Sequence, residues 1–239
     1  MANLQKKEDR NTSVELLKMS NKSFKYWTRQ DIADRFGLDI KSNCSHLDNW
    51  LKADIELSEE EQEDLNRLRR KLKQNVDAWN EQELVIKFIA LLIDKVDFDN
   101  ANFKSFANRK LSGVIDGERI SGEVDLMIAS GQFEPKEPYF CLHEYKKEKG
   151  VDNDPLGQLI IAMMTAQELN QNQHPVYGAY VMERNWFFLT LEGTKYCISD
   201  EYVATRDDIF SILKILKKLK LIIAQLSIEK AGTRASKDS

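Results

Sequence analysis

The strongest constraint on this chain is a change in the spacing of its apolar residues near residue 110. Before that point apolar residues recur at helical spacing and no proline occurs, since all four prolines lie between 135 and 175. After it, short runs that alternate apolar and polar residues indicate strands, and one apolar helix interrupts them. The resulting order, α-β-β-β-α-β-β-α, predicts an α+β fold with a mixed sheet flanked by helices.

The N-terminal 77 residues are predicted to be helical. Ser58 and Glu61 have the spacing of a capping box, and the helix that follows has a narrow apolar stripe. Asn80 and Glu83 form a second such pair and open a helix through about Val96. This helix is apolar nearly all round, so we expect it to be central. The four apolar residues of the first stripe are Leu65, Leu68, Leu72 and Val76.

Residues 28–51 allow two interpretations. The sequence TRQDIADRFGL followed by IKSNCSHLDNWL has the pattern of a helix-turn-helix. It also fits a plain helical hairpin whose apolar side chains pack against each other, and we favour this second interpretation because short patterns of the first kind recur by chance. The side chains that would pack in the hairpin are Ile32, Phe36, Leu47, Trp50 and Leu51.

Three predicted strands lie between residues 111 and 147. The first two form a hairpin with its turn at Asp116-Gly117. Alternation places Val124, Leu126 and Ile128 on one face of the second strand, and Glu123, Asp125 and Met127 on the other. In the third, YFCLHEYKK, one face carries Phe140, Leu142, Glu144 and Lys146, and His143 points the opposite way, where we expect it to be packed or partly exposed rather than a ligand.

The second half of the sheet follows an apolar helix. Asp154 and Pro155 predict its N-terminus, with Gln158 in the first turn. Two strands, PVYGAYVME and WFFLTLEG, come next, with TKYCIS as a possible third. A long amphipathic helix then starts at Thr205 or Asp207.

Composition excludes several classes of protein. A net charge of −4 excludes a protein that coats nucleic acid through a globally basic surface. No stretch approaches the roughly 18 consecutive apolar residues of a membrane span, and the first residues lack the apolar centre of a secretory signal. Three distant cysteines predict neither a disulfide framework nor a zinc cluster. We therefore expect a soluble, cytoplasmic protein with no membrane contact.

Asp125, Glu144 and Lys146 are the residues that carry the clearest chemistry. If the hairpin and the third strand are neighbours, two carboxylates and an ammonium group come together at the end of an apolar strand face. Paired carboxylates suit a hard divalent cation such as Mg²⁺. A lysine beside them would orient a water molecule or stabilise developing negative charge. Phosphodiester hydrolysis requires this set of groups.

At these residues the chain resembles the PD-(D/E)XK nuclease superfamily, which includes restriction endonucleases and RecB-type nucleases. The resemblance rests on Asp125 in GEVDLMIAS, on Glu144-Tyr145-Lys146 as the E-x-K element, and on Gln158 in the next helix. It covers about residues 78–200, and it implies a restriction-endonuclease-like fold with an α-β-β-β-α-β core. Val124 stands where the proline of the motif would be. On this basis we divide the chain into a helical extension (1–77), a nuclease-like domain (78–230) and a flexible tail (231–239).

The resemblance implies a role for each matching residue. Asp125 and Glu144 would bind Mg²⁺ or Mn²⁺, with the backbone carbonyl of Tyr145 as a further ligand. Lys146 would position or activate the attacking water, and Gln158 would orient Lys146 or contact a phosphate. Glu83, on the helix before the hairpin, would be an ancillary acid, binding a second metal through water. The expected function is that of a metal-dependent nuclease (hydrolase) acting on nucleic acid, with DNA favoured as substrate and a homodimer as one assembly.

Simpler interpretations stay open for the same residues. Glu144 and Lys146 would form an ordinary surface salt bridge, Glu83 is already explained as a capping residue, and Gln158 as a polar residue of a first helical turn. Glu123, on the predicted face of Asp125, is either a further ligand or lies further out. For the whole chain, the alternatives are a catalytically silent nuclease fold that binds nucleic acid or protein, and a purely structural protein. No P-loop, G-x-G-x-x-G motif or G-x-S-x-G elbow occurs.

Overall fold

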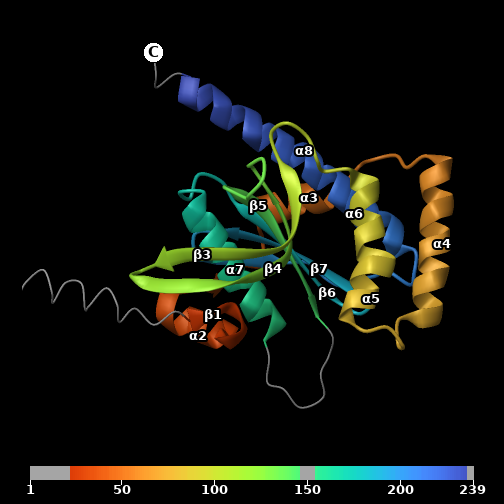
Figure 1. Ribbon diagram of the computed structural model, residues 1–239, viewed down its shortest axis with the longest axis horizontal. Coiled ribbons are helices and arrows are strands. Elements are labelled where there is room, and N and C mark those ends of the chain that lie inside the picture. Colours follow the sequence, from red (N-terminus) through yellow and green to blue (C-terminus); the bar gives the residue numbers. More distant parts are fainter. Residues whose placement is uncertain (1–21, 146–153, 236–239) are drawn as a thin grey trace, which may run out of the picture.

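The computed structural model describes residues 22–145 and 154–235, with backbone alone for residues 144, 145 and 230–235. In this part of the chain a mixed sheet of nine strands has helices on both faces (Figure 1). The strands are β1 (Lys22–Ser23), β2 (Asp39–Ile40), β3 (Lys104–Ile115), β4 (Glu118–Ala129), β5 (Pro138–Tyr145), β6 (Val176–Met182), β7 (Asn185–Glu192), β8 (Lys195–Ile198) and β9 (Tyr202–Val203). The helical segments are η1 (Phe24–Tyr26), α2 (Arg29–Phe36), α3 (Ser45–Leu51), α4 (Glu59–Asn75), α5 (Glu81–Leu84), η2 (Val85–Ile89), α6 (Ala90–Val96), α7 (Pro155–Leu169) and α8 (Asp208–Ala235).

The strand order confirms the predicted mixed sheet. Strands run in the order β1-β4-β5-β6-β7-β8-β2, with β3 paired to β4 and β9 to β7. β5 and β6 are parallel because α7 carries the chain back between them, whereas β4 pairs antiparallel with β3 and β5. The β3–β4 hairpin turns at Asp116 and Gly117, whose φ angles of 47° and 81° fit a type I′ turn, as predicted.

The alternation of side chains in β4 differs from the prediction at Val124. Leu126 and Ile128 pack in one core, and Met127 in the other, as expected. Val124, however, packs with Met127, so the prediction that it shares a face with Leu126 was wrong. The opposite strand explains the change, because Asn108 has a φ of 49° between the pairs Ala107–Leu126 and Arg109–Val124. Asp125 therefore lies at the point in β4 where the regular alternation of side chains between the two faces is interrupted.

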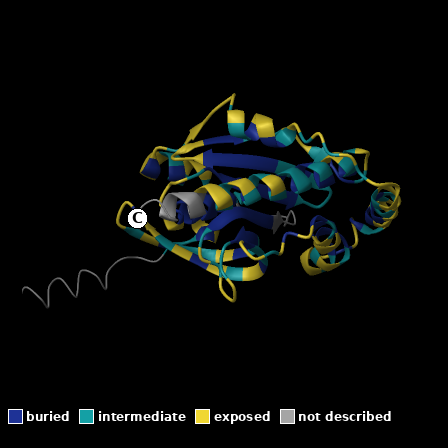
Figure 2. Ribbon diagram, turned by 90° about the horizontal axis from the view of Figure 1, so that it is seen from above, coloured by how far each residue is buried: buried dark blue, intermediate teal, exposed yellow. Residues whose placement is uncertain are grey.

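One face of the sheet is covered by α7 and α2. The Asp154 side chain caps α7 by accepting from the Gly157 N–H at 3.1 Å, with Pro155 in the first turn, as predicted. A Cβ atom at Gly157 would lie 2.7–2.9 Å from backbone atoms of residues 27–29, so only glycine allows this approach. Every residue of α7 from Leu156 to Gln167 is buried. Figure 2 shows the buried strands between the helical layers.

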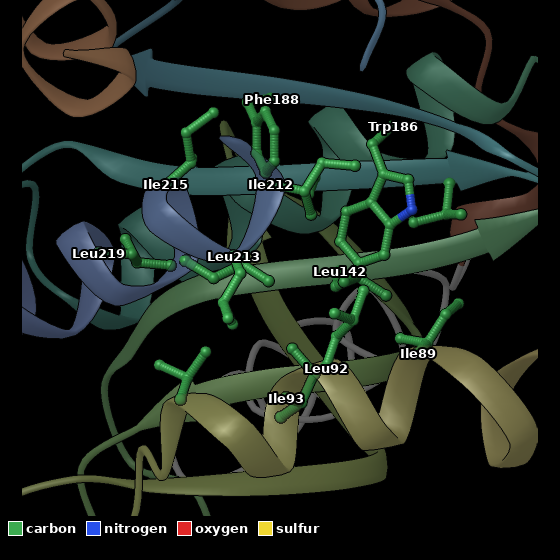
Figure 3. Close-up of a cluster of buried hydrophobic side chains, with 14 of the residues drawn as sticks. Ile89, Leu92, Ile93, Leu142, Trp186, Phe188, Ile212, Leu213, Ile215 and Leu219 are labelled. Carbon is green, nitrogen blue, oxygen red and sulfur yellow. The ribbon is translucent and has the colours of Figure 1, made fainter. Parts of the chain in front are cut away.

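The other face is covered by α3, α4, α8 and the continuous helix α5–η2–α6. Figure 3 shows Leu92 and Ile93 from this helix, Leu213 from α8, and Phe188 from β7 gathered in one core. The Trp50 Nε1–H of α3 donates to the Ile215 carbonyl of α8 at 2.8 Å. The expected helical extension therefore shares its core with α8. The capping box at Ser58 and the buried stripe of α4 are confirmed.

The α5–η2–α6 helix was predicted through Val96, and this is confirmed, with a π-helical turn at η2. The expectation that it is central was wrong. Ile86 is 69% exposed and Leu91 is 39% exposed, so no helix or strand among the described residues covers these two side chains. The long C-terminal helix begins at Asp208, close to the predicted start, and continues through Ala235 into the segment expected to be a tail.

Residues 28–51 follow neither of the two arrangements considered. Ile32 and Phe36 of α2 pack in the core on the α7 side, whereas Leu47 and Trp50 of α3 pack in the core on the α8 side. Between the two helices, β2 pairs with β8 at the edge of the sheet. The helices therefore do not pack on each other, because the chain passes around the sheet edge between them.

The cysteine prediction was wrong. Cys44 and Cys197 form a disulfide with Cα atoms 6.1 Å apart, although 153 positions separate them in sequence. The β2–β8 pairing brings the start of α3 beside β8, which no count of cysteines could reveal. The prediction of a cytoplasmic protein rested partly on the expected absence of disulfides. This disulfide removes that support, since disulfides persist mainly in oxidising compartments. In the described segments, no helix has the length and apolar character to cross a bilayer.

Candidate active site

Asp125 lies on β4, the strand between β3 and β5. The antiparallel register pairs Leu126 with Leu142 and Met127 with Cys141, so it brings Asp125 into line with His143. The Nδ1 atom of His143 is 3.4 Å from an Oδ2 atom of Asp125. The Asp125 side chain is 38% exposed and the imidazole only 8%. The carboxylate therefore reaches solvent while a buried ring supports it.

A cavity of about 280 Å³ opens at this carboxylate. Asp125 and Gln158, two of the predicted site residues, both line it, although they come from β4 and from the first turn of α7. Gln158 is buried, which agrees with an inward-facing side chain rather than a solvated one. The remaining lining residues are Ser23, Phe24, Lys25, Gly122, Glu123 and His143.

The E-x-K element is only partly described. The backbone of Glu144 and Tyr145 belongs to β5, where Glu144 pairs with Val181 of β6. Their side chains and all of Lys146 lie outside the described residues. The metal-binding roles of Glu144 and of the Tyr145 carbonyl, and the catalytic role of Lys146, therefore stay predictions.

Glu83 is a capping residue, as the simpler interpretation had it. Its backbone N–H donates to Asn80 Oδ1 at 2.9 Å, and its carboxylate accepts from the Asn80 N–H at 3.2 Å. The carboxylate also forms an ion pair with Lys87 one turn later. Among the described residues that line the cavities at Asp125, Glu83 does not appear. Its role as an ancillary acid stays a prediction that is compatible with the cap.

His143 is the residue that sequence reasoning missed. The prediction that His143 is packed is confirmed, since the ring is buried, but no role in the site was predicted for it. The register between β4 and β5 would have revealed the contact of His143 with Asp125. The sequence does not determine this register, because residues 130–137 connect the two strands and the pairing is irregular at Ile128–Ala129. Glu123, considered as a further ligand, lines the same cavity as Asp125.

The donor atoms at the cavity suit a hard cation in part. The carboxylates of Asp125 and Glu123 and the amide oxygen of Gln158 are oxygen donors of the kind that Mg²⁺ prefers. Within residues 22–145 and 154–235, no group of three or more histidine, cysteine, aspartate or glutamate side chains is arranged to hold a metal. A complete metal site would therefore need groups from the E-x-K element.

Comparison of the chain with models of known protein families gave no match, and no curated protein matched it either.

Proposed function

We propose that this protein is a Mg²⁺-dependent nuclease that hydrolyses phosphodiester bonds in DNA, built on a restriction-endonuclease-like fold. The observation that carries the proposal is that Asp125 and Gln158 line one cavity although β4 and α7 are far apart in sequence. His143 of β5 also lines this cavity, and the same strand carries Glu144 and leads into Lys146. If the motif residues occurred in the sequence by chance, Asp125 and Gln158 would have no reason to line the same cavity.

The chemistry assigned to each side chain follows from its type and place. Asp125, Glu144 and the Tyr145 carbonyl would hold the metal, which when bound polarises a phosphoryl oxygen and acidifies water. Lys146 would position the attacking water, and Gln158 would orient Lys146 or contact a phosphate. His143 would hold the Asp125 carboxylate in place through the Nδ1 contact of 3.4 Å.

The test is cleavage of plasmid, linear and single-stranded DNA in Mg²⁺ or Mn²⁺. We expect Asp125→Asn and Lys146→Ala each to lower the rate by at least about 100-fold, the scale of a lost catalytic group. Asp116→Asn and Lys195→Ala are matched controls, because both residues are exposed and lie outside the cavity. They should leave cleavage unchanged.

The outcomes separate the proposal from its rival. Cleavage that survives Lys146→Ala would remove the mechanism. DNA binding without cleavage by the unaltered protein would favour the silent nuclease fold, in which His143 and Asp125 serve only to support the sheet. Absence of both binding and cleavage would overturn both interpretations.

A further inference from the structure

A second cavity, of about 380 Å³, lies on the opposite side of Asp125 from Gln158. It separates the η2–α6 helix from β3, β4 and β5. We call it the α6 cleft. Its volume falls within the range of pockets that hold small molecules, at the lower end. Asp125 is the one described residue that lines both cavities.

The floor of the α6 cleft is apolar. Val85, Ile89 and Ile93 contribute it from the helix, and Leu126 and Leu142 from the sheet. Figure 3 shows Ile89 and Ile93 on the helix facing Leu142 on β5. Val85 and Ile89 are the first and last residues of the π-helical turn η2, an irregularity that often occurs at functional sites. Such a floor favours an apolar ligand over a sugar or phosphate.

The rim of the α6 cleft carries negative charge. Asp94, Asp97, Asp99 and Asp125 line it, and no lysine or arginine stands among the described lining residues. Lys220 of α8 lies 3.7 Å from Asp97 and offsets one of these charges. Asp99 accepts from the Ser105 N–H and hydroxyl at 2.8 and 2.6 Å, which fixes the position of its carboxylate. The rim therefore attracts a cation and repels an anion.

We propose that the α6 cleft binds a small amphipathic cation, an aromatic or alkyl amine whose apolar part fills the floor and whose ammonium group meets the acidic rim. The apolar floor supplies most of the affinity, and the carboxylates select the charge. The proposal does not rest on the nuclease function, since binding is measured without any substrate. If the nuclease function holds, an amine in the cleft competes with the metal at Asp125 and slows cleavage.

The experiment titrates three probes of similar size into the full-length protein and follows the methyl NMR signals of Ile89, Ile93 and Leu126. The probes are phenethylamine, which is a cation at pH 7, the neutral phenethyl alcohol, and the anion 3-phenylpropionate. We expect the amine to bind at least about tenfold more tightly than the anion. Equal affinity for amine and anion, or no binding of the amine, would overturn the proposal.

Two pairs of variants locate the site. Ala90→Trp fills the cleft from its mouth and should abolish amine binding, whereas Leu91→Trp, at the next and non-lining position, should leave it intact. Asp94→Asn should weaken amine binding about two- to fivefold, as expected for one exposed ion pair, and Asp116→Asn, on the distant hairpin turn, should not. Unchanged amine binding in Ala90→Trp would place the amine elsewhere and overturn the assignment to the cleft.

Discussion

The helices α7 and α5–η2–α6 are similarly rich in apolar residues but have different surroundings. Both are apolar on nearly every side, and both pack on the same sheet from opposite faces. α7 is buried from Leu156 to Gln167 because α2 and η1 cover the side away from the sheet. The other helix packs on the sheet and on α8, and its Lys95 pairs with Asp64 of α4, but Ile86 and Leu91 are exposed. Apolar content shows that a helix has something to bury, but not whether the fold provides a second layer.

The same difference bears on function. The buried helix α7 borders the cavity beside Asp125 through Gln158 in its first turn. The looser packing of α6 against β3 and β4 leaves an open apolar cleft. Asp125 borders both spaces, so the two faces of the sheet supply different chemistry to one carboxylate: polar donors from the α7 side, and an apolar surface with acidic rim from the α6 side.

Truncation of one isoleucine in each helix should give the largest contrast. We expect Ile160→Ala in α7 to lower the free energy of unfolding by about 2–5 kcal/mol, because the side chain is fully buried and leaves a cavity. Ile86→Ala removes the same atoms from a site that is 69% exposed and should change it by less than about 0.5 kcal/mol. Urea unfolding measures both. Similar losses in the two variants would mean that the outer side of α5–η2–α6 is covered in solution.

The two cores also differ in the state of their cysteines. Cys197 belongs to the α8-side core and is linked to Cys44, whereas Cys141, in the α7-side core, is a free thiol. Burial raises the pKa of the Cys141 thiol to about 12, so it is neutral and protected at pH 7. Cys197→Ser should destabilise the protein by about 2–4 kcal/mol, as expected for opening a long closed loop.

The check on the cysteines is alkylation of the folded protein followed by mass spectrometry, with and without reductant. We expect no label without reductant and a label at Cys44 with it, since Cys44 is half-buried whereas Cys141 and Cys197 are buried. Cys141→Ser is the control and should not change the count. Labelling of Cys44 without reductant would show that the disulfide is absent in solution.

Local sequence rules predicted the helix starts and the hairpin turn well, because the residues that decide them are neighbours in the chain. The prediction that residues 1–77 are helical was wrong at β1 and β2, which pair with distant strands. The caps at Ser58, Asn80 and Asp154 and the turn at Asp116-Gly117 are confirmed. These features depend on hydrogen bonds that span only a few residues. What failed was non-local: the chain between α2 and α3 passes around the sheet edge through β2, and this also brings Cys44 to Cys197.

In the candidate site, too, local features were predicted and contacts between strands were not. The predicted start of the helix gave Gln158 its place in the first turn of α7. That His143 and Glu144 point to opposite faces stays a prediction, because the Glu144 side chain lies outside the described residues. The meeting of Asp125 with His143 depends on the register between β4 and β5, and on the exchange of faces near Asn108. Neither leaves a signal in a single sequence, because both arise from pairing between strands. The α6 cleft was not predicted for the same reason.

The smallest expected effect concerns one carboxylate on each face, Asp154 and Glu61. Burial acts to raise the pKa of Asp154, but hydrogen bonds from the Arg29 N–H and Nε at 2.8 and 2.9 Å and from Gly157 outweigh it, so the pKa lies below its ordinary value of 3.8. The pKa of Glu61 also lies below its ordinary value of 4.5, first because Lys217 of α8 donates to it. Each carboxylate therefore stabilises the fold above its ordinary pKa, and that contribution is lost as the pH falls through the lowered pKa.

Asp154→Asn and Glu61→Gln should each remove a part of the acid sensitivity. Asparagine still caps a helix well, so Asp154→Asn tests the charge rather than the cap. We expect each variant to lose no more than about 1 kcal/mol of unfolding free energy at pH 7, since the Arg29 side chain is more than half exposed and solvent screens its attraction to Asp154. Urea unfolding between pH 7 and pH 3 should show the difference from the unaltered protein shrinking as the pH falls below 4. A difference that stays constant with pH would mean that the loss comes from packing, and that the ion pairs joining α7 to α2 and α8 to α4 add nothing.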